Sequence, residues 1–110
     1  MDENGPVLVL VTFGSLDEAR KFSETAVSQQ LAACVNLFPN VESIYRWNDA
    51  MERATEVAGV IKTMRGRLGA LEECYRAVHS YEVPEFLILP VSGGGADYLA
   101  WLRGAVADGA

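Results

Sequence analysis

Two long extended stretches joined by one turn constrain the fold of this chain more than any other feature. The first runs from Ala32 to Trp47, the second from Glu56 to Thr63, and Asn48-Asp49-Ala50 has the composition of a turn. The sixteen residues 32–47 would span roughly 50 Å. A domain of this length is only roughly 35 Å across. The predicted hairpin must therefore bend, with Pro39 as the candidate bulge, or project beyond its domain.

Apolar runs on either side of the hairpin predict two further strands. Val7–Phe13 and Phe86–Val91 are apolar on both faces, which is typical of strands buried on both sides. Since one sheet face is needed for helices, we expect the other face to be buried against another subunit.

Helical patterns predict three helices. Ser15 and Glu18 form a capping box that begins a helix running to about Gln30. A second helix is expected from Arg67 to Val78 and a third from Asp97 to Ala107. The third should point four apolar side chains inward, with Trp101 beside them: Tyr98, Leu99, Leu102 and Val106. The resulting order is β-α-β-β-α-β plus a terminal helix, an α+β fold of the ferredoxin-like, split βαβ kind.

Length and charge limit the number of domains and the kinds of partner that the chain can have. A chain of 110 residues is enough for one domain and too short for two, so residues 1–110 should form a single domain. The net charge of −6 argues against a nucleic-acid partner. The longest apolar run is too short to span a membrane. The start, Met1-Asp2-Glu3-Asn4, is acidic where a secretory leader would be basic, so we expect a cytoplasmic protein.

Five short segments fall in order at the spacing of a known family. They are Ala33–Asn36 with Pro39, Ser43–Trp47, Glu56–Thr63, His79–Glu85 and Tyr98–Trp101. Over nearly its whole length the chain resembles the CutA1 family of divalent-cation tolerance proteins. The resemblance implies a ferredoxin-like fold assembled as a tight homotrimer, similar in architecture to the PII signalling proteins. It also implies a link to tolerance of copper and other divalent metals.

The chain departs from the family pattern at two turns. Ser80 stands where the family usually has proline after the histidine. Asn48-Asp49 stands near the position where the family usually has glycine. Because Asn and Asp adopt left-handed turn conformations, we expect the hairpin to form nevertheless.

The segment His79–Glu85 concentrates the candidate metal ligands, His79, Glu82 and Glu85. Imidazole and carboxylate suit Zn²⁺ or Cu²⁺. Pro84 disfavours a helix through Glu82, so the three side chains are expected to diverge unless a neighbouring subunit completes the site. Cys34 is a candidate Cu(I) ligand, although a buried inert thiol is the plainer interpretation. In the structural alternative, His79 ends the second helix and interacts with its terminal carbonyls, while the two glutamates bond backbone or basic partners.

Lys62 suggests a second candidate site, a cleft between subunits. It shares a strand face with apolar residues, where an ammonium group needs a carboxylate partner. Its partner is expected among Glu56, Glu82 and Glu85, and the same pair serves equally well as a salt bridge that locks the trimer. The candidate cleft residues are Lys62, Tyr45, Trp47 and Tyr81.

These observations favour a non-enzymatic homotrimer that acts in the response to divalent metal ions and binds copper or another divalent cation at subunit clefts. The alternative is a PII-like signalling or scaffold trimer that binds a small organic ligand or a partner protein. An enzyme is not favoured, because the single histidine has no nucleophile at a recognisable spacing. Gly93-Gly94-Gly95 lacks the Lys-Ser/Thr of a phosphate-binding loop. No resident cofactor is assigned.

Overall fold

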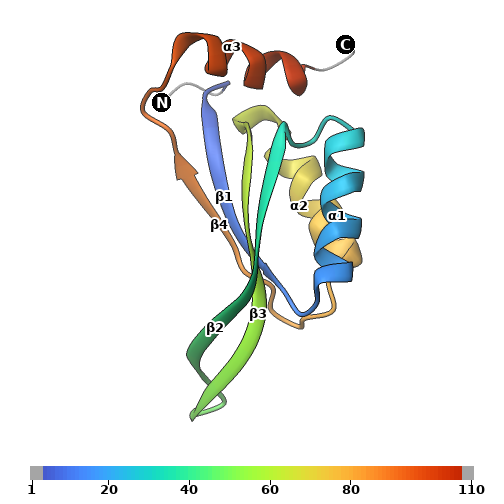
Figure 1. Ribbon diagram of the computed structural model, residues 1–110, viewed down its shortest axis with the longest axis vertical. Helices are drawn as coiled ribbons and strands as arrows, with labels where there is room; N and C mark the ends of the chain where they lie inside the picture. Colours follow the sequence, from blue (N-terminus) through green and yellow to red (C-terminus); the bar gives the residue numbers. More distant parts are fainter. Residues whose placement is uncertain (1–3, 108–110) are drawn as a thin grey trace.

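The order of strands and helices confirms the predicted α+β class (Figure 1). The computed structural model describes residues 4–107, so the acidic start at residues 1–3 and the end at residues 108–110 lie outside the described residues. The elements are β1 (Pro6–Phe13), α1 (Leu16–Ser28), β2 (Cys34–Trp47), β3 (Ala50–Met64), the 3₁₀ turn η1 (Arg65–Arg67), α2 (Leu68–Val78), β4 (Phe86–Pro90) and α3 (Ala96–Ala105).

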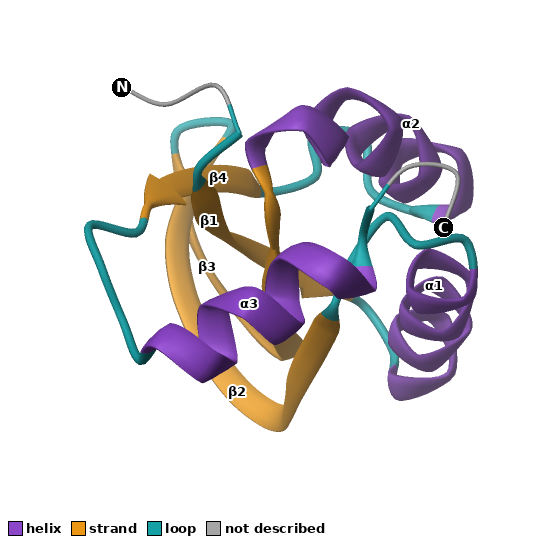
Figure 2. Cartoon of the chain, turned by 90° about the horizontal axis from the view of Figure 1, so that it is seen from above, coloured by secondary structure: helices purple, strands orange, loops and turns teal. Residues whose placement is uncertain are grey.

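The four strands form one antiparallel sheet in the order β2-β3-β1-β4. This order is the split βαβ arrangement that the sequence predicted. Helices α1 and α2 lie side by side on one face of the sheet, and α3 crosses near one end of it (Figures 1 and 2). No helix within residues 4–107 is long and apolar enough to cross a membrane.

Burial on β1 alternates along the strand. Val7, Val9, Val11 and Phe13 are almost fully buried, whereas the residues between them are only half-buried. The buried face packs against side chains from α1 and α2, including Phe22, Leu71 and Tyr75. The expected burial of β1 on both faces is therefore not met within one chain, because α1 and α2 cover only one of them.

The exposure of β4 and α3 also corrects the sequence-based expectation. Leu87, Ile88 and Leu89 of β4 are exposed to 57%, 43% and 40%, because β4 is an edge strand. Helix α3 buries only Leu102, which clusters with Val106 just after the helix and with Ala33 and Met64. Two aromatic residues of α3 stay exposed, Tyr98 to 46% and Trp101 to 50%.

Helix α1 begins as predicted. The hydroxyl of Ser15 accepts a hydrogen bond from the Glu18 amide at 3.2 Å. This bond satisfies one of the amide groups that a helix leaves without a partner in its first turn. The Ser15 cap fixes where β1 ends and α1 begins, directly beside the site described below.

The hairpin carries a bulge at the predicted place. Phe38 pairs with Ala58, and the next pair is Val41 with Glu56, so that Pro39 and Asn40 are additional residues in β2. Asn40 has φ 62°, a conformation that Asn adopts more readily than most residues. Beyond the bulge the outer half of the hairpin projects away from the helices (Figure 1).

A two-residue turn closes the hairpin between Trp47 and Ala50, which pair directly. Asn48 and Asp49 have φ 49° and 63°. Positive φ at both positions defines a type I′ turn, whose twist matches that of the flanking strands. The expectation that the hairpin forms with Asn and Asp in its turn is confirmed.

Candidate functional site

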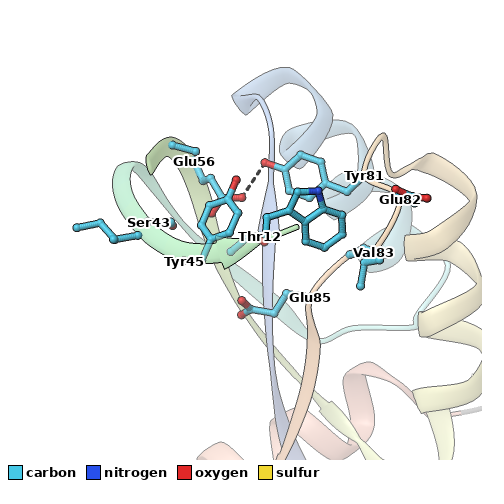
Figure 3. A pocket seen from close by; sticks show the side chains of 12 residues that line it. Thr12, Ser43, Tyr45, Glu56, Tyr81, Glu82, Val83 and Glu85 are labelled. Carbon is cyan, nitrogen blue, oxygen red and sulfur yellow. Dashed lines mark hydrogen bonds between the residues drawn. The ribbon is translucent and has the colours of Figure 1, made fainter. Parts of the chain in front are cut away.

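A cavity of about 910 Å³ lies between the outer half of the hairpin and the segment that follows α2 (Figure 3). Strand β1 reaches it through Thr12. Its lining residues come from β1, β2, β3 and the loop before β4: Thr12, Ser43, Ile44, Tyr45, Trp47, Ala54, Glu56, Tyr81, Glu82, Val83, Pro84 and Glu85.

The bulge in β2 builds the hairpin wall of this cavity. Directly paired residues of antiparallel strands point to the same face. Beyond the bulge, Ser43 pairs with Ala54 and Tyr45 with Glu52. The odd-numbered residues of β2 therefore share a face with the even-numbered residues of β3, including Glu56. The pairing beyond the bulge thus sets Tyr45 and Trp47 on the same face as Glu56.

His79 anchors the loop wall from behind. It ends α2 in extended backbone, and its side chain is fully buried. The Tyr81 amide donates to His79 Nδ1 at 3.0 Å, and Nε2 lies 2.6 Å from the carbonyl oxygen of Thr12. Since Nδ1 accepts, the proton resides on Nε2, which donates to Thr12. Both nitrogens of the neutral ring are thus occupied.

Aromatic contacts hold the same histidine ring in place. It stacks on Phe13 at 5.7 Å between centroids, with 18° between the planes. Tyr75 and Tyr81 meet it edge-on at 4.7 and 4.6 Å. The Tyr75 hydroxyl also donates to the Thr12 carbonyl, at 2.9 Å. His79 therefore positions the loop on the end of β1 and does not face the cavity.

Tyr81 joins the loop wall to the hairpin wall. Its hydroxyl donates to Glu56 Oε2 at 2.7 Å (Figure 3). Burial, and then the hydrogen bond to the Glu56 carboxylate, raise the pKa of Tyr81 well above its ordinary value. A Cβ atom at Gly14 would approach the Tyr81 ring to 3.2 Å, so the ring lies directly against the backbone after β1.

The cavity is acidic. Glu56, Glu82 and Glu85 line it, and none of the described lining residues is Lys, Arg or His. Partial burial, and then the nearby Glu56 carboxylate, raise the pKa of Glu85. The Glu85 carboxylate points toward the hairpin, whereas that of Glu82 points away from it (Figure 3). Such a site favours positively charged ligands.

The four candidate metal ligands are not brought together. Glu82 and Glu85 line the cavity, but His79 lies behind it with both ring nitrogens bonded. Cys34 pairs with Lys62 in the inner half of the hairpin, with Sγ 4.0 Å from Asn36 Oδ1. Within residues 4–107, no three His, Cys, Asp or Glu side chains are arranged to hold a metal ion.

The structural alternative for His79 is also modified. The histidine ends α2 as expected, but it bonds the carbonyl of Thr12 on a neighbouring strand and not the last carbonyls of its own helix. The extended backbone at His79 explains the difference, because it turns the ring away from the helix axis.

Three of the four candidate cleft residues meet in the cavity: Tyr45, Trp47 and Tyr81. Lys62 does not. Its Nζ lies 5.7 Å from the centre of the Tyr98 ring on α3, a cation–π distance. Its expected pairing with a glutamate is not formed in the described residues. The register explains this, since Lys62 is six positions from Glu56 along β3, roughly 20 Å.

Thr12 and Ser43 were not predicted from the sequence. Glu56 was one of three expected partners of Lys62, but its partner is Tyr81. The alternation of side chains in β3 places Glu56 on the cavity face. Only the folded structure shows that Glu56 bonds Tyr81 and not Lys62, because Tyr81 lies 25 positions from Glu56 in the sequence.

Comparison with known proteins identifies the family. The family model described as "CutA1 divalent ion tolerance protein" matches residues 7–105. The divalent-cation tolerance protein CutA of Thermus thermophilus is 40% identical over 96 residues, which cover 87% of this chain and 93% of that protein. The chloroplastic CutA 1 protein of rice is 36% identical over 102 residues. Those residues cover 93% of this chain but only 58% of the rice protein's own length.

A solved structure supports the same assignment. The divalent cation tolerance protein Cut A1 from Thermus thermophilus superposes with a TM-score of 0.88 at 38% identity, covering 91% of this chain and 97% of that one. The strand order, the long hairpin and the sequence match agree with one another, and the resemblance first seen in five short segments is confirmed. The chain belongs to the CutA1 family of divalent ion tolerance proteins.

Proposed function

We propose that this chain acts without catalysis, as a homotrimer that contributes to tolerance of divalent metal ions and binds a divalent cation at clefts between subunits. The observation that carries the proposal is the acidic cavity, which is lined by three glutamates and by no basic residue among those described. Copper is the cation that we propose first, because affinity at sites with nitrogen and oxygen ligands is highest for Cu²⁺ among the divalent first-row metals.

The trimer is supported by apolar surface that one chain leaves open. Strands β2 and β4 are the two edges of the sheet, and unpaired edges are commonly covered by partner chains. Large apolar side chains are exposed on both edges and on α3: Phe38, Ile44, Leu87, Leu89 and Trp101. Exposed apolar surface of this kind marks an association site.

Cation binding is supported by Glu82 and Glu85, two exposed residues that line the cavity. Two carboxylates are too few for a complete site, so a neighbouring subunit has to supply further ligands. His79 would join only by giving up the hydrogen bond from the Tyr81 amide. Cys34 lies elsewhere on the sheet and would act as a separate Cu(I) ligand.

Calorimetric titration of the full chain with Cu²⁺ and with Zn²⁺ tests the metal proposal. We expect the double variant Glu82→Gln/Glu85→Gln to bind at least about tenfold more weakly, the equivalent of roughly 1.4 kcal/mol. Glu24→Gln, an exposed carboxylate on α1, is the matched control and should bind like the wild type. Equal affinity in all three proteins contradicts the proposal, and loss of binding in His79→Ala would add the imidazole to the site.

Sedimentation of the same proteins tests the assembly. A trimer is expected for the wild type at micromolar concentration. The variant Leu87→Glu places a charge on the open face of β4 and should shift the population toward monomer. A wild type that stays monomeric contradicts the trimer and, with it, the completion of a site by a neighbour.

A second candidate function is a PII-like trimer that binds a small organic ligand. The size of the cavity favours it, since about 910 Å³ falls in the range of roughly 300–1,000 Å³ typical of small-molecule sites. Three aromatic side chains also line the cavity, Tyr45, Trp47 and Tyr81. A hydrated metal ion would not coordinate aromatic rings, whereas an organic ligand can pack against them. Native mass spectrometry of the freshly purified trimer tests this function, and absence of any co-purifying species counts against it.

The proposal also includes the cellular location and the number of domains. We place the protein in the cytoplasm and treat residues 1–110 as one domain. The rice relative is described as chloroplastic, so the compartment has to be measured directly. Fractionation of cells that express the full chain tests the location, and a single cooperative unfolding transition tests the domain assignment.

A further inference from the structure

We propose that the cavity binds an organic cation, with an alkylammonium group held between the aromatic rings of Trp47, Tyr45 and Tyr81 and the carboxylates of Glu56 and Glu85. This inference rests on the second candidate function and names its ligand class. It requires neither a metal ion nor His79.

Charge complementarity supports a cation. Glu56 and Glu85 face the same space, and their mutual repulsion contributes to the raised pKa of Glu85. No Lys, Arg or His among the described residues lines the cavity to offset them. The Tyr81 hydroxyl donates to Glu56, but this bond supplies no formal positive charge. A bound cation would therefore relieve a repulsion that the folded chain retains.

The aromatic walls favour an organic cation over a bare metal ion. Ammonium groups with apolar substituents bind over the faces of Trp and Tyr within about 6 Å of the ring centre. Trp47 and Tyr45 are still exposed to 42% and 44% beside the carboxylates. Divalent ions bind through oxygen, nitrogen or sulfur ligands and would leave these rings unused.

The walls are held in place before any ligand binds. The type I′ turn and the β2 bulge fix Tyr45 and Trp47 on the face of Glu56. Tyr81 is held by its amide bond to His79, its hydroxyl bond to Glu56 and its contact with Gly14. A preformed aromatic and acidic surface lowers the ordering cost of binding.

Titration with choline and with its uncharged isostere 3,3-dimethylbutan-1-ol tests the inference, with binding followed by calorimetry on the full chain. We expect choline to bind at least about tenfold more tightly than the neutral compound, because only choline gains from the carboxylates and from cation–π contact. Equal affinity for the two compounds overturns the inference, as does the absence of choline binding.

Two variants locate the site. Trp47→Leu should weaken choline binding about threefold to tenfold, and Glu85→Gln should weaken choline but not the neutral compound. Trp101→Leu is the matched control, since Trp101 is an exposed tryptophan on α3 outside the cavity. Circular dichroism and sedimentation verify that each variant folds and assembles like the wild type. Unchanged choline binding in Trp47→Leu and Glu85→Gln overturns the assignment to this cavity.

The same variants separate this inference from the metal proposal. Trp47→Leu should leave Cu²⁺ binding unchanged, because an indole ring is not a metal ligand. Cu²⁺ binding without choline binding overturns this inference and leaves the metal proposal intact. Choline binding that Trp47→Leu weakens, in a chain that binds no Cu²⁺, supports this inference and contradicts the metal proposal.

Discussion

The two halves of the β2–β3 hairpin share one antiparallel ladder but lie in different surroundings. In the inner half, β3 alternates between buried and half-buried residues, and Ile61 is fully buried against α1 and α2. In the outer half, beyond the bulge, Ile44, Trp47 and Met51 are exposed to 57%, 42% and 75%. The strands stay paired on both sides of the bulge, so pairing alone does not decide burial. Burial depends on whether α1 and α2 cover the strand face, and they cover only the inner half.

The inner half packs in the core, whereas the outer half presents residues that line the cavity. The inner half is held by packing against Phe13, Leu71 and Tyr75. The outer half is held by a turn, a bulge and the Tyr81–Glu56 hydrogen bond, and its apolar side chains stay exposed in the chain. The following four predictions test this contrast, beginning with the largest expected effect.

The largest effect is expected from Ile61→Ala in the inner half. Removing a fully buried isoleucine should lower the free energy of unfolding by about 2–5 kcal/mol, because a cavity remains in the core. Ile44→Ala in the outer half should cost less than about 1 kcal/mol. Urea unfolding at fixed protein concentration measures both. Equal losses would show that the outer half is buried as deeply as the core, as the proposed trimer would bury it.

Gly59→Ala should also disrupt the inner half. A Cβ atom there would lie 2.9 Å from Val11 Cγ2 and 3.4 Å from Phe13 Cε2, so overpacking should cost about 1–3 kcal/mol. Gly69→Ala in α2 is the control, since the added Cβ would meet nothing within 4 Å apart from its chain neighbours and the backbone of its own helix. That helix should gain up to about 1 kcal/mol. Thermal melts distinguish the two, and a neutral Gly59→Ala would contradict the packing described here.

Asp49→Gly should stabilise the outer half slightly. Asp49 has φ 63° at the second position of the type I′ turn, where glycine avoids the steric cost that other residues incur. We expect a gain of about 0.5–1 kcal/mol, read as a higher unfolding midpoint. Ala50→Gly, in the adjoining strand, should instead destabilise. A lower midpoint for Asp49→Gly would show that its side chain is needed in the assembled protein.

The smallest effect is expected from Glu85→Gln and appears as a change in pH dependence. The pKa of Glu85 in the folded chain is raised above its ordinary value of 4.5. As the pH rises through 4.5, the unfolded chain releases this proton first, so wild-type stability falls with rising pH. Glu85→Gln should remove that fall, which solvent screening keeps small.

Urea midpoints between about pH 4 and pH 7 measure this effect, with Glu24→Gln as the control. Identical pH profiles for wild type and Glu85→Gln would contradict the raised pKa and weaken the case for an acidic cavity. A larger difference in the wild-type background than in Leu87→Glu, which is expected to weaken the proposed trimer, would show that a neighbouring subunit buries Glu85 further.

Local patterns were sufficient for much of the fold. Ser15 was predicted to cap α1, Pro39 to mark the bulge and Asn48-Asp49 to close the hairpin, and the structure shows each of them. These features depend on residues within a few positions of one another. Their backbone conformations follow from side-chain chemistry that acts over the same short range.

The site was only partly accessible from the sequence. Glu82, Glu85, Tyr45, Trp47 and Tyr81 were assigned to candidate sites and do line one cavity. Lys62 was grouped with them because of its charge and lies elsewhere, against Tyr98. Composition indicates which side chains carry charge or aromatic rings. It does not indicate which of them lie within a few ångströms of one another.

The sequence by itself determined the order of the elements, the antiparallel hairpin, the acidic character and the family, because these depend on local preference and on residue identity. Only the tertiary structure decided what the chemically richest segment does. It placed His79 behind the cavity, bonded at both ring nitrogens, and it joined Tyr81 to Glu56. The physical reason is that the bonds from His79 to Thr12 and from Tyr81 to Glu56 span 67 and 25 positions, and only the packed fold brings such distant residues together.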